Sequence, residues 1–390
     1  MRTIRKDILI FFIVAIYDSV CNGISWPSFV LLSKKFTGPL HSSDEIYFSI
    51  IAIYSFFQAV GGPLLAFYSD KFGYKKVIIF SLSVGAIDNL FSACTSSLAS
   101  LYTVRAICGL LNATTPVVTA YLISAEKNLE NSEVLIGRLQ ACGAAGMILG
   151  PIVGGALTLI SSTTPFLFMA FCSIVLDIFV FIHINENYFL KEPQKPKPCI
   201  TTNIIHRSNY IFIVIFFLIT LSEDFSIVVF PYYGKNILNI SIMRVSELLT
   251  VIAILSIFSH TFILNYLTRL NCKKILMVSC LLSSIIGYGI ILTISNSDYI
   301  ILSIVFMAFG GIFLTIIESI LYDKTSKIYY NKLSGILFFI SSVCAILAPI
   351  IAMAFFGNHF YGNINKFLWL FPIISLLIAL TAITRITGNL

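Results

Sequence analysis

The sequence predicts an all-α polytopic membrane protein, with twelve transmembrane helices in two six-helix bundles. Three observations support this fold class. The chain is 58% hydrophobic and only 11% charged, its apolar residues form twelve long runs, and one proline- and lysine-rich break divides the runs into two sets of six. A soluble protein carries about 25% charged residues. The 34 phenylalanines and the long aliphatic runs exceed what one or two soluble cores can bury, whereas a bilayer also accepts apolar residues on the outside.

Each run is long enough to cross a bilayer, because a spanning helix needs about 20 mostly apolar residues. The first run follows a charged start that resembles a signal peptide. No small-residue cleavage site follows a short apolar core, so we interpret this run as a retained first helix. The expected spans are 8–32, 46–69, 75–95, 99–124, 134–158, 164–184, 208–233, 243–267, 273–294, 299–323, 332–356 and 364–385.

The longest polar break lies at 185–207, where residues 191–198 read Lys-Glu-Pro-Gln-Lys-Pro-Lys-Pro. Prolines lack an N–H donor and resist helix formation, so this segment is expected to be an exposed linker. We therefore predict an N-terminal six-helix bundle at 1–184, a linker at 185–207 and a C-terminal six-helix bundle at 208–390.

Lys and Arg residues predict the orientation. Nineteen of the 25 lie at the termini and in every second loop, five lie on the opposite side, and Arg105 lies inside a span. Positively charged loops stay cytoplasmic, so both termini and the linker should be cytoplasmic. This distribution also argues against nucleic acid as a partner, despite the net charge of +7.

The two halves align without a gap over four spans. The Lys-Lys-Val of residues 75–77 falls on the Lys-Lys-Ile of 273–275, and the Gly-Pro-Ile of 150–152 falls on the Ala-Pro-Ile of 348–350. Both pairs are separated by 198 positions. Two parallel six-helix repeats with a site between them near the midplane are a known transporter plan. The first half holds the sharper motifs.

The first motif follows span 2. Asp70 is at a helix end, beside a tight turn that needs Gly73, and Lys71, Lys75 and Lys76 follow at the cytoplasmic surface. Asp70 either pairs with cations or caps a neighbouring helix, which would latch one conformation, or the cluster is solvated and only orients the protein.

The second motif lies in span 5. Gly146, Gly150 and Gly154 are spaced four apart and share one helix face, and Gly155 follows. Such a face lets two helices approach backbone to backbone, or it reflects plain small-residue packing. Pro151 removes a helix hydrogen bond and can kink the span.

These stretches resemble signatures of the major facilitator transporters. Residues 66–76 resemble G-x-x-x-D-[RK]-x-G-[RK]-[RK] with two replacements, and residues 146–155 match the antiporter signature G-x-x-x-G-P-x-x-G-G at every fixed position. Residues 101–109 resemble L-x-x-x-R-x-x-Q-G, and residues 18–27 resemble the D-x-x-x-x-G-x-x-x-P run of the twelve-helix drug/proton antiporters. Most of the first 180 residues are similar to the tetracycline/proton antiporters.

The resemblance implies two six-helix bundles in a V shape that rock around a central cavity. It implies that the Asp70 motif gates the cytoplasmic side, and that the glycine face of span 5 is the sliding or sealing surface between the halves. It further implies that Arg105 tunes the protonation of a nearby carboxylate. The tetracycline/proton antiporters carry an acid in span 9, and span 9 of this chain has none.

Ionisable residues inside spans are functional candidates, because each costs several kcal/mol unless it is paired or hydrated. Arg105 lies ~9 Å from the outer end of span 4, whereas Asp88 and Asp18 lie ~20 Å and ~15 Å from the inner face. Either acid is within reach of Arg105. The family plan places spans 1 and 4 on the cavity, so we expect Asp18 to be its partner and Asp88 to be structural.

Other polar residues in the spans leave two interpretations open. Glu223 and Asp224 are adjacent acids in span 7 that either bind protons or a cation, or mark an early end of the span that leaves them in water. Gln58, Asn112 and Gln140 either bind substrate or bridge helices.

Three further ionisable residues are expected to have structural roles. Glu318 lies near the inner end of span 10, within reach of Lys324. Asp177 lies in span 6 with no obvious partner, and His260 in span 8 is expected to be a hydrogen-bonded packing residue.

The predicted function is secondary active transport of a small organic molecule by alternating access, with proton-coupled export favoured. The alternatives are a uniporter or proton symporter of a small metabolite, and a transporter-like sensor without flux. The sequence contains no P-loop, H-E-x-x-H or nucleophile-elbow motif, so we expect neither enzymatic activity nor a cofactor or metal. The expected partners are the substrate, protons and the lipid bilayer, and the chain is expected to be a monomer.

Overall fold

A computed structural model describes residues 2–38, 42–125, 129–184, 210–259, 273–293, 300–323, 330–356 and 367–384, and nearly all of these residues are helical. The expected linker at 185–207 and His260 lie outside the described residues. The chain forms two compact units. Unit 1 is Met1–Lys197 with Ile242–Glu247, and unit 2 is Pro198–Ser241 with Leu248–Leu390.

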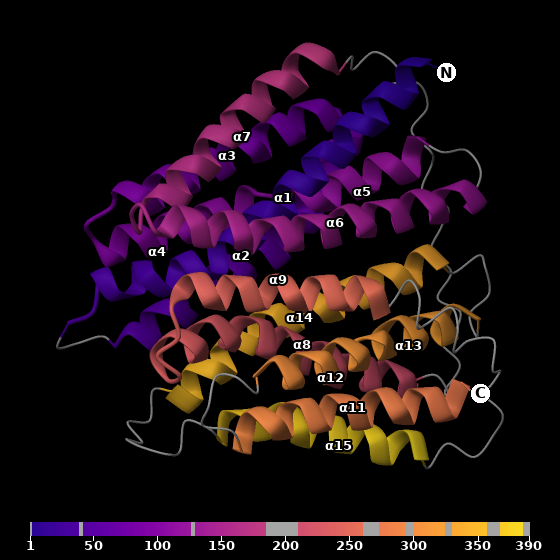
Figure 1. Ribbon diagram of the computed structural model, residues 1–390. Helices are drawn as coiled ribbons and strands as arrows, with labels where there is room; N and C mark the ends of the chain where they lie inside the picture. Colours follow the sequence, from indigo (N-terminus) through magenta and orange to yellow (C-terminus); the bar gives the residue numbers. More distant parts are fainter. Residues whose placement is uncertain are drawn as a thin grey trace. The chain divides into compact units, whose positions relative to one another are not determined.

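Seven helices form most of unit 1 (Figure 1). They are α1 (Arg2–Lys35), α2 (Ser43–Phe72), α3 (Tyr74–Cys94), α4 (Leu98–Leu111), α5 (Thr114–Ala125), α6 (Leu129–Thr158) and α7 (Thr164–His183).

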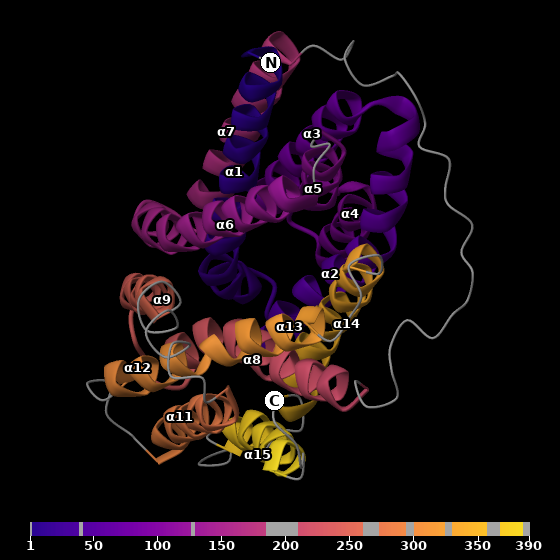
Figure 2. The same cartoon turned by 90° about the vertical axis from the view of Figure 1, so that its right-hand side faces the viewer.

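The remaining helices begin with α8, which lies in unit 2. The first six residues of α9 (Ile242–Glu247) belong to unit 1, and its other residues belong to unit 2. α11 packs alongside α15, as both views show (Figures 1 and 2). The helices are α8 (Tyr210–Asn236), α9 (Ile242–Phe258), α11 (Lys273–Thr293), α12 (Ile300–Gly310), α13 (Ile312–Asp323), α14 (Tyr330–Phe356) and α15 (Leu370–Thr384).

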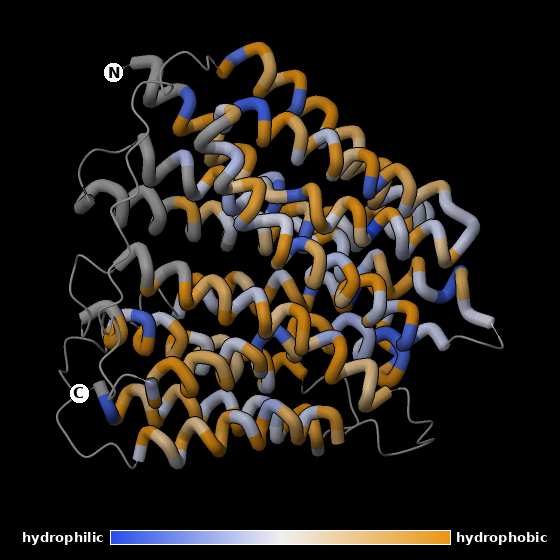
Figure 3. The backbone as a smooth tube through the Cα atoms, turned by 180° about the vertical axis from the view of Figure 1, so that it is seen from behind, coloured by the Kyte–Doolittle hydropathy of each residue, from blue (hydrophilic) through white to orange (hydrophobic). Residues whose placement is uncertain are grey.

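The helices account for all twelve expected spans, with α4 and α5 together forming span 4 and α12 and α13 together forming span 10. Within the described ranges, nine segments are long and apolar enough to cross a membrane by themselves. Apolar residues are frequent along all of these helices (Figure 3). Large apolar side chains such as Phe171 and Phe181 on α7 are about two-thirds exposed, as a lipid-facing surface requires.

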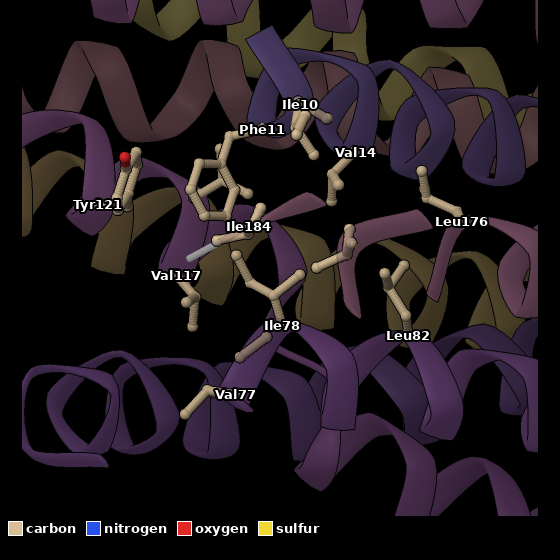
Figure 4. Close-up of a cluster of buried hydrophobic side chains, with 14 of the residues drawn as sticks. Ile10, Phe11, Val14, Val77, Ile78, Leu82, Val117, Tyr121, Leu176 and Ile184 are labelled. Carbon is tan, nitrogen blue, oxygen red and sulfur yellow. The ribbon is translucent and has the colours of Figure 1, made fainter. Parts of the chain in front are cut away.

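Buried apolar side chains from α1, α3, α5 and α7 form a core inside unit 1 (Figure 4). Phe11 of α1 packs on Tyr121 of α5 with ring centroids 4.0 Å apart, and Ile78 of α3 lies in the same cluster. Lipid tails are as apolar as these side chains, so close packing rather than transfer out of water stabilises helix association here.

Both broken spans are interrupted at their middle and at equivalent positions of the repeat. α4 and α5 are separated by residues 112–113, whereas α12 and α13 are separated by Gly311. Gly311 lies 198 positions after Ala113, which is the offset found in the sequence. The internal repeat therefore extends from the sequence to the course of the backbone.

The turn between α2 and α3 depends on Gly73, as expected. Its φ of 97° lies in a region that L side chains rarely adopt, and its N–H donates to the carbonyl of Ser69 at 3.0 Å. Directly after the turn, Lys75 Nζ donates to the carbonyl oxygen of Phe181 at 2.7 Å. A cation is favourable there because α7 ends two residues later, at His183.

Candidate functional site

The glycine face of α6 packs directly on α1. A Cβ added to Gly150 would lie 2.6 Å from the carbonyl oxygen of Val20 and 2.8 Å from Gly23 Cα, both in α1. A Cβ added to Gly146 would lie 2.8 Å from the carbonyl oxygen of Ile16. Real Cβ atoms are not found this close to such neighbours, so only glycine allows this backbone-to-backbone approach.

This contact corrects one expectation from the sequence. Gly146, Gly150 and Gly154 all face α1, which belongs with α6 to unit 1, so the face that these three share does not lie between the expected halves. Gly155 has another neighbour, because a Cβ added to it would lie 2.7 Å from Ser246 Cβ of α9. Pro151 lies within the unbroken helix α6. The first three glycines therefore fix α1 against α6.

A buried ion pair joins α3 to α4. Arg105 Nη1 and Asp88 Oδ2 lie 2.6 Å apart, and the two side chains are only 9% and 8% exposed. The expectation that Arg105 pairs with Asp18 is therefore wrong. Asp88 and Arg105 lie on α3 and α4, which contact one another, whereas the Asp18 carboxylate on α1 accepts a hydrogen bond from the Thr115 hydroxyl of α5 at 2.7 Å.

Aromatic rings cover the arginine of this pair. The guanidinium carbon of Arg105 lies 4.0 Å from the ring centroid of Tyr54 and 4.8 Å from that of Phe29. Two stacked rings and one carboxylate compensate a buried cation well. Asp88 Oδ1 and Arg105 Nε are buried without a hydrogen-bond partner among the described residues.

Sequence reasoning missed Tyr54, whose ring centroid lies 4.0 Å from the guanidinium carbon of Arg105. Among the 18 tyrosines of the chain, no motif distinguishes it. Thr115 was also missed, because a threonine next to a helix start is more often a cap than a partner for a distant acid.

The expected substrate residues lie in different settings. Asn112 Oδ1 accepts hydrogen bonds from Thr114, from its N–H at 3.3 Å and its hydroxyl at 3.0 Å, so Asn112 caps the start of α5. Gln58 is half-buried on α2. The side chain of Gln140 lies outside the described residues.

The gating motif is only partly described. The side chains of Asp70 and Lys71 lie outside the described residues, so the expected latch stays a prediction. Gly73 forms the turn between α2 and α3, and Lys75 contacts the end of α7, as described above. Lys76 is exposed.

The acids of span 7 lie inside a long helix. Glu223 and Asp224 are in α8, which continues without interruption to Asn236, so the helix does not end at these acids. Glu318 is half-buried on α13, and its expected neighbour Lys324 lies outside the described residues. Asp177 of α7 accepts a hydrogen bond from the Ser83 hydroxyl of α3 at 2.6 Å, which agrees with a structural role.

A helical membrane protein with a six-helix internal repeat and carboxylates inside its spans has the architecture of a transporter. The family model of the Major Facilitator Superfamily matches residues 9–349. The chain therefore belongs to the Major Facilitator Superfamily, and the expected fold class is confirmed.

Curated relatives include several drug efflux proteins. The tetracycline resistance protein class H of Pasteurella multocida is 24% identical over 373 residues, which cover 94% of this chain and 92% of the relative. The class C protein of Escherichia coli is 25% identical over 358 residues, which cover 88% of each chain.

Solved structures share the fold. A bacterial homologue of the human lysosomal transporter Spinster, in an inward-facing and occupied conformation, aligns with a TM-score of 0.77 at 12% identity, covering 98% of this chain and 96% of that one. The nucleoside transporter NupG aligns with a TM-score of 0.72 at 14% identity, covering 97% and 99%.

Proposed function

We propose that this chain is a secondary active transporter that exports a small organic molecule in exchange for protons by alternating access. The observation that carries the proposal is Asp18, a carboxylate inside α1 that accepts a hydrogen bond from the hydroxyl of Thr115 rather than from a base. A charged carboxylate within a span costs several kcal/mol unless it is paired or hydrated. Taking up a proton removes that cost, so Asp18 is suited to bind and release a proton.

The buried pair of Asp88 and Arg105 supports this role. Arg105 is already neutralised by Asp88, so it does not hold Asp18 permanently in its charged form. The Tyr54 ring lies against the guanidinium of Arg105, 4.0 Å from its carbon, and helps to hold the pair in place.

The alternating-access part of the proposal rests on the family and the repeat. We propose bundles at 1–184 and 208–390, joined by a cytoplasmic linker at 185–207, with both termini in the cytoplasm. The Asp70 motif would latch the cytoplasmic side, and the α1–α6 contact would move as one rigid body. Tetracycline resistance proteins are similar over most of this chain, which favours export of a small organic molecule.

Proton movement in proteoliposomes tests the proposal. Vesicles that contain the purified protein and an internal pH dye receive an outward or inward gradient of tetracycline, and then of other small organic molecules. Antiport predicts proton movement opposite to the substrate gradient. Asp18→Asn should abolish this coupling while substrate binding or downhill exchange persists.

Asp177→Asn is the matched control, because Asp177 is also an acid inside a span that accepts one hydroxyl hydrogen bond. The control should couple normally. Normal coupling in Asp18→Asn would transfer the role to Glu223 and Asp224. Substrate flux without proton flux in the native protein would establish a uniporter, and proton flux in the same direction would establish a symporter.

A further inference from the structure

A hydroxyl on a neighbouring helix lies directly against Asp18. The Thr115 hydroxyl of α5 donates a hydrogen bond to Asp18 Oδ2 at 2.7 Å. Asp18 is the seventeenth of the 34 residues of α1, so this contact joins the two helices far from the ends of α1. Thr115 is exposed and Asp18 is half-buried, so the pair is not sealed inside unit 1 and a proton can reach it.

The break in span 4 explains why this hydroxyl is available. A threonine inside a helix commonly donates its hydroxyl to a carbonyl of the preceding turn. Thr119 does so, with the Thr115 carbonyl oxygen at 2.9 Å. Thr115 is the second residue of α5, so α5 has no turn before it. Its hydroxyl bonds to Asp18 instead.

Two contacts fix the start of α5, and with it the position of Thr115. Asn112 Oδ1 accepts hydrogen bonds from the N–H of Thr114 at 3.3 Å and from its hydroxyl at 3.0 Å. The N–H of Ala113 donates to the hydroxyl oxygen of Ser81 on α3 at 3.2 Å. The first turn of α5 is thus held by a side-chain cap and by α3, which keeps the Thr115 hydroxyl in a defined place.

The contact favours the charged form of Asp18. A hydroxyl that donates to a carboxylate stabilises its negative charge, and such charge-assisted hydrogen bonds are about twice as strong as neutral ones. The N-terminal end of α5 carries a partial positive charge that acts in the same direction. Arg105 does not take this part, because its guanidinium is paired with Asp88.

The other titratable groups around Asp18 are ordinarily neutral. Tyr17 and Cys21 belong to α1 itself, and Tyr54 belongs to α2. Of the helices packed on α1, neither α6 nor α7 presents a charged side chain to Asp18 within the described residues. In this part of the chain, the Thr115 hydroxyl is therefore the side-chain contact that favours the charged form of Asp18.

The second half of the chain forms the same break without such a hydroxyl. The residue 198 positions after Thr115 is Phe313, the second residue of α13, and it is only 1% exposed. A half-helix can thus begin at this place with an apolar side chain. The break does not require the Thr115 hydroxyl, which leaves the contact with Asp18 as its role.

We propose that Thr115 is a positioning residue that sets the pH at which Asp18 takes up and releases its proton. The inference deepens the proposed function, on which it rests, because it names the group that tunes the proton site. When Asp18 is charged, the Thr115 hydroxyl donates to it and holds it in place. When Asp18 is protonated, this hydrogen bond loses its charge assistance, and the difference between the two states sets the pH of proton exchange.

Labelling with a carbodiimide measures the protonation of Asp18 without a substrate. Dicyclohexylcarbodiimide enters membranes and reacts with the protonated form of a carboxyl group. The purified protein in lipid vesicles is treated briefly over a range of pH, and mass spectrometry gives the modified fraction of the peptide that contains Asp18. The midpoint of this profile is the pH at which Asp18 binds its proton. Asp18→Asn should remove the label at this position.

Variants of Thr115 then test its role. Thr115→Val keeps the shape of the side chain and removes the donor. It should move the midpoint to a higher pH by about one unit or more, because charged Asp18 loses a charge-assisted hydrogen bond. Thr115→Ser keeps the hydroxyl and should have the native midpoint. Thr119→Val is the matched control and should also have the native midpoint, because it removes a hydroxyl of the same helix that donates only to the backbone.

A native midpoint in Thr115→Val would overturn the inference, and so would equal shifts in Thr115→Val and Thr119→Val. Thr115→Ala also lacks the hydroxyl, and it supplies the same test if Thr115→Val does not fold.

The outcome is separable from that of the proposed function. A shifted midpoint in Thr115→Val, in a protein that moves no protons against substrate in vesicles, would support this role of Thr115 and refute antiport. Proton-coupled flux that depends on Asp18, with a native midpoint in Thr115→Val, would support antiport and refute the inference.

Discussion

The contact between α1 and α6 leads to a sharp prediction about steric bulk. Gly150→Ala adds one methyl group where the two backbones meet, and Gly150→Leu adds a whole side chain. The added Cβ would lie 2.6 Å from the Val20 carbonyl oxygen and 2.8 Å from Gly23 Cα. Both neighbours are backbone atoms, so no rotamer change relieves the overlap and one helix must shift.

The size of the effect follows from that geometry. Ordinary van der Waals contact for a Cβ begins near 3.4 Å, so α1 and α6 must separate by most of an ångström for alanine and by more for leucine. Overpacking typically costs about 1–3 kcal/mol. We expect Gly150→Ala to lower stability by an amount in this range, and Gly150→Leu to abolish transport or folding.

Gly143→Ala is the matched control on the same helix, because its Cβ would lie 3.6 Å from Ser19 Oγ, an ordinary contact. The assay is thermal unfolding of each purified variant together with proton-coupled flux in vesicles. Gly150→Ala should melt at a lower temperature than Gly143→Ala, because only the first substitution overpacks two backbones. A fully active and equally stable Gly150→Leu would show that this glycine face meets lipid and not α1.

Three further predictions follow from other features. Asp88→Asn leaves Arg105 buried without its carboxylate and should cost about 3–5 kcal/mol, measured by thermal unfolding, whereas removing both charges should cost less; equal losses would mean that the pair is not coupled. Asp70→Asn should weaken transport with near-normal expression and shift the inward/outward balance, and unaffected transport would reduce the motif to an orientation signal. Protease treatment of sealed cells should leave tags at both termini and the linker at 185–207 intact, and cleavage from outside would reverse the predicted topology.

The sequence was sufficient for the helices and for the close approach of α6. Span positions follow from runs of apolar residues, which are local in the chain. The turn at Gly73 and the glycine spacing of span 5 can also be recognised locally, because glycine marks positions where a side chain would not fit. Which helix packs on the glycine face depends on tertiary structure. The family resemblance implied that this face meets the other half of the chain, whereas Gly146, Gly150 and Gly154 meet α1.

The partner of Arg105 was beyond local reasoning. Depth along the membrane placed both Asp18 and Asp88 within reach of its long side chain, and depth says nothing about the rotation of each helix about its axis. α3 presents Asp88 to the guanidinium at 2.6 Å, while α1 presents Asp18 to Thr115. Tyr54 carried no sequence signal, because a tyrosine that packs on apolar side chains and one that covers a guanidinium look alike in a sequence.

The interruption shared by spans 4 and 10 is held differently in the two halves. The residues at the break are Asn-Ala at 112–113 and Gly-Gly at 310–311, so the two halves of the chain reach the same interruption with different residues. In the first half a side-chain cap from Asn112 supports it, and in the second the absence of side chains permits it. The two interruptions are therefore unequal: two residues separate α4 from α5, whereas between α12 and α13 a single residue stands out and its N–H still donates to the Met307 carbonyl at 3.0 Å, which keeps that span closer to one continuous helix.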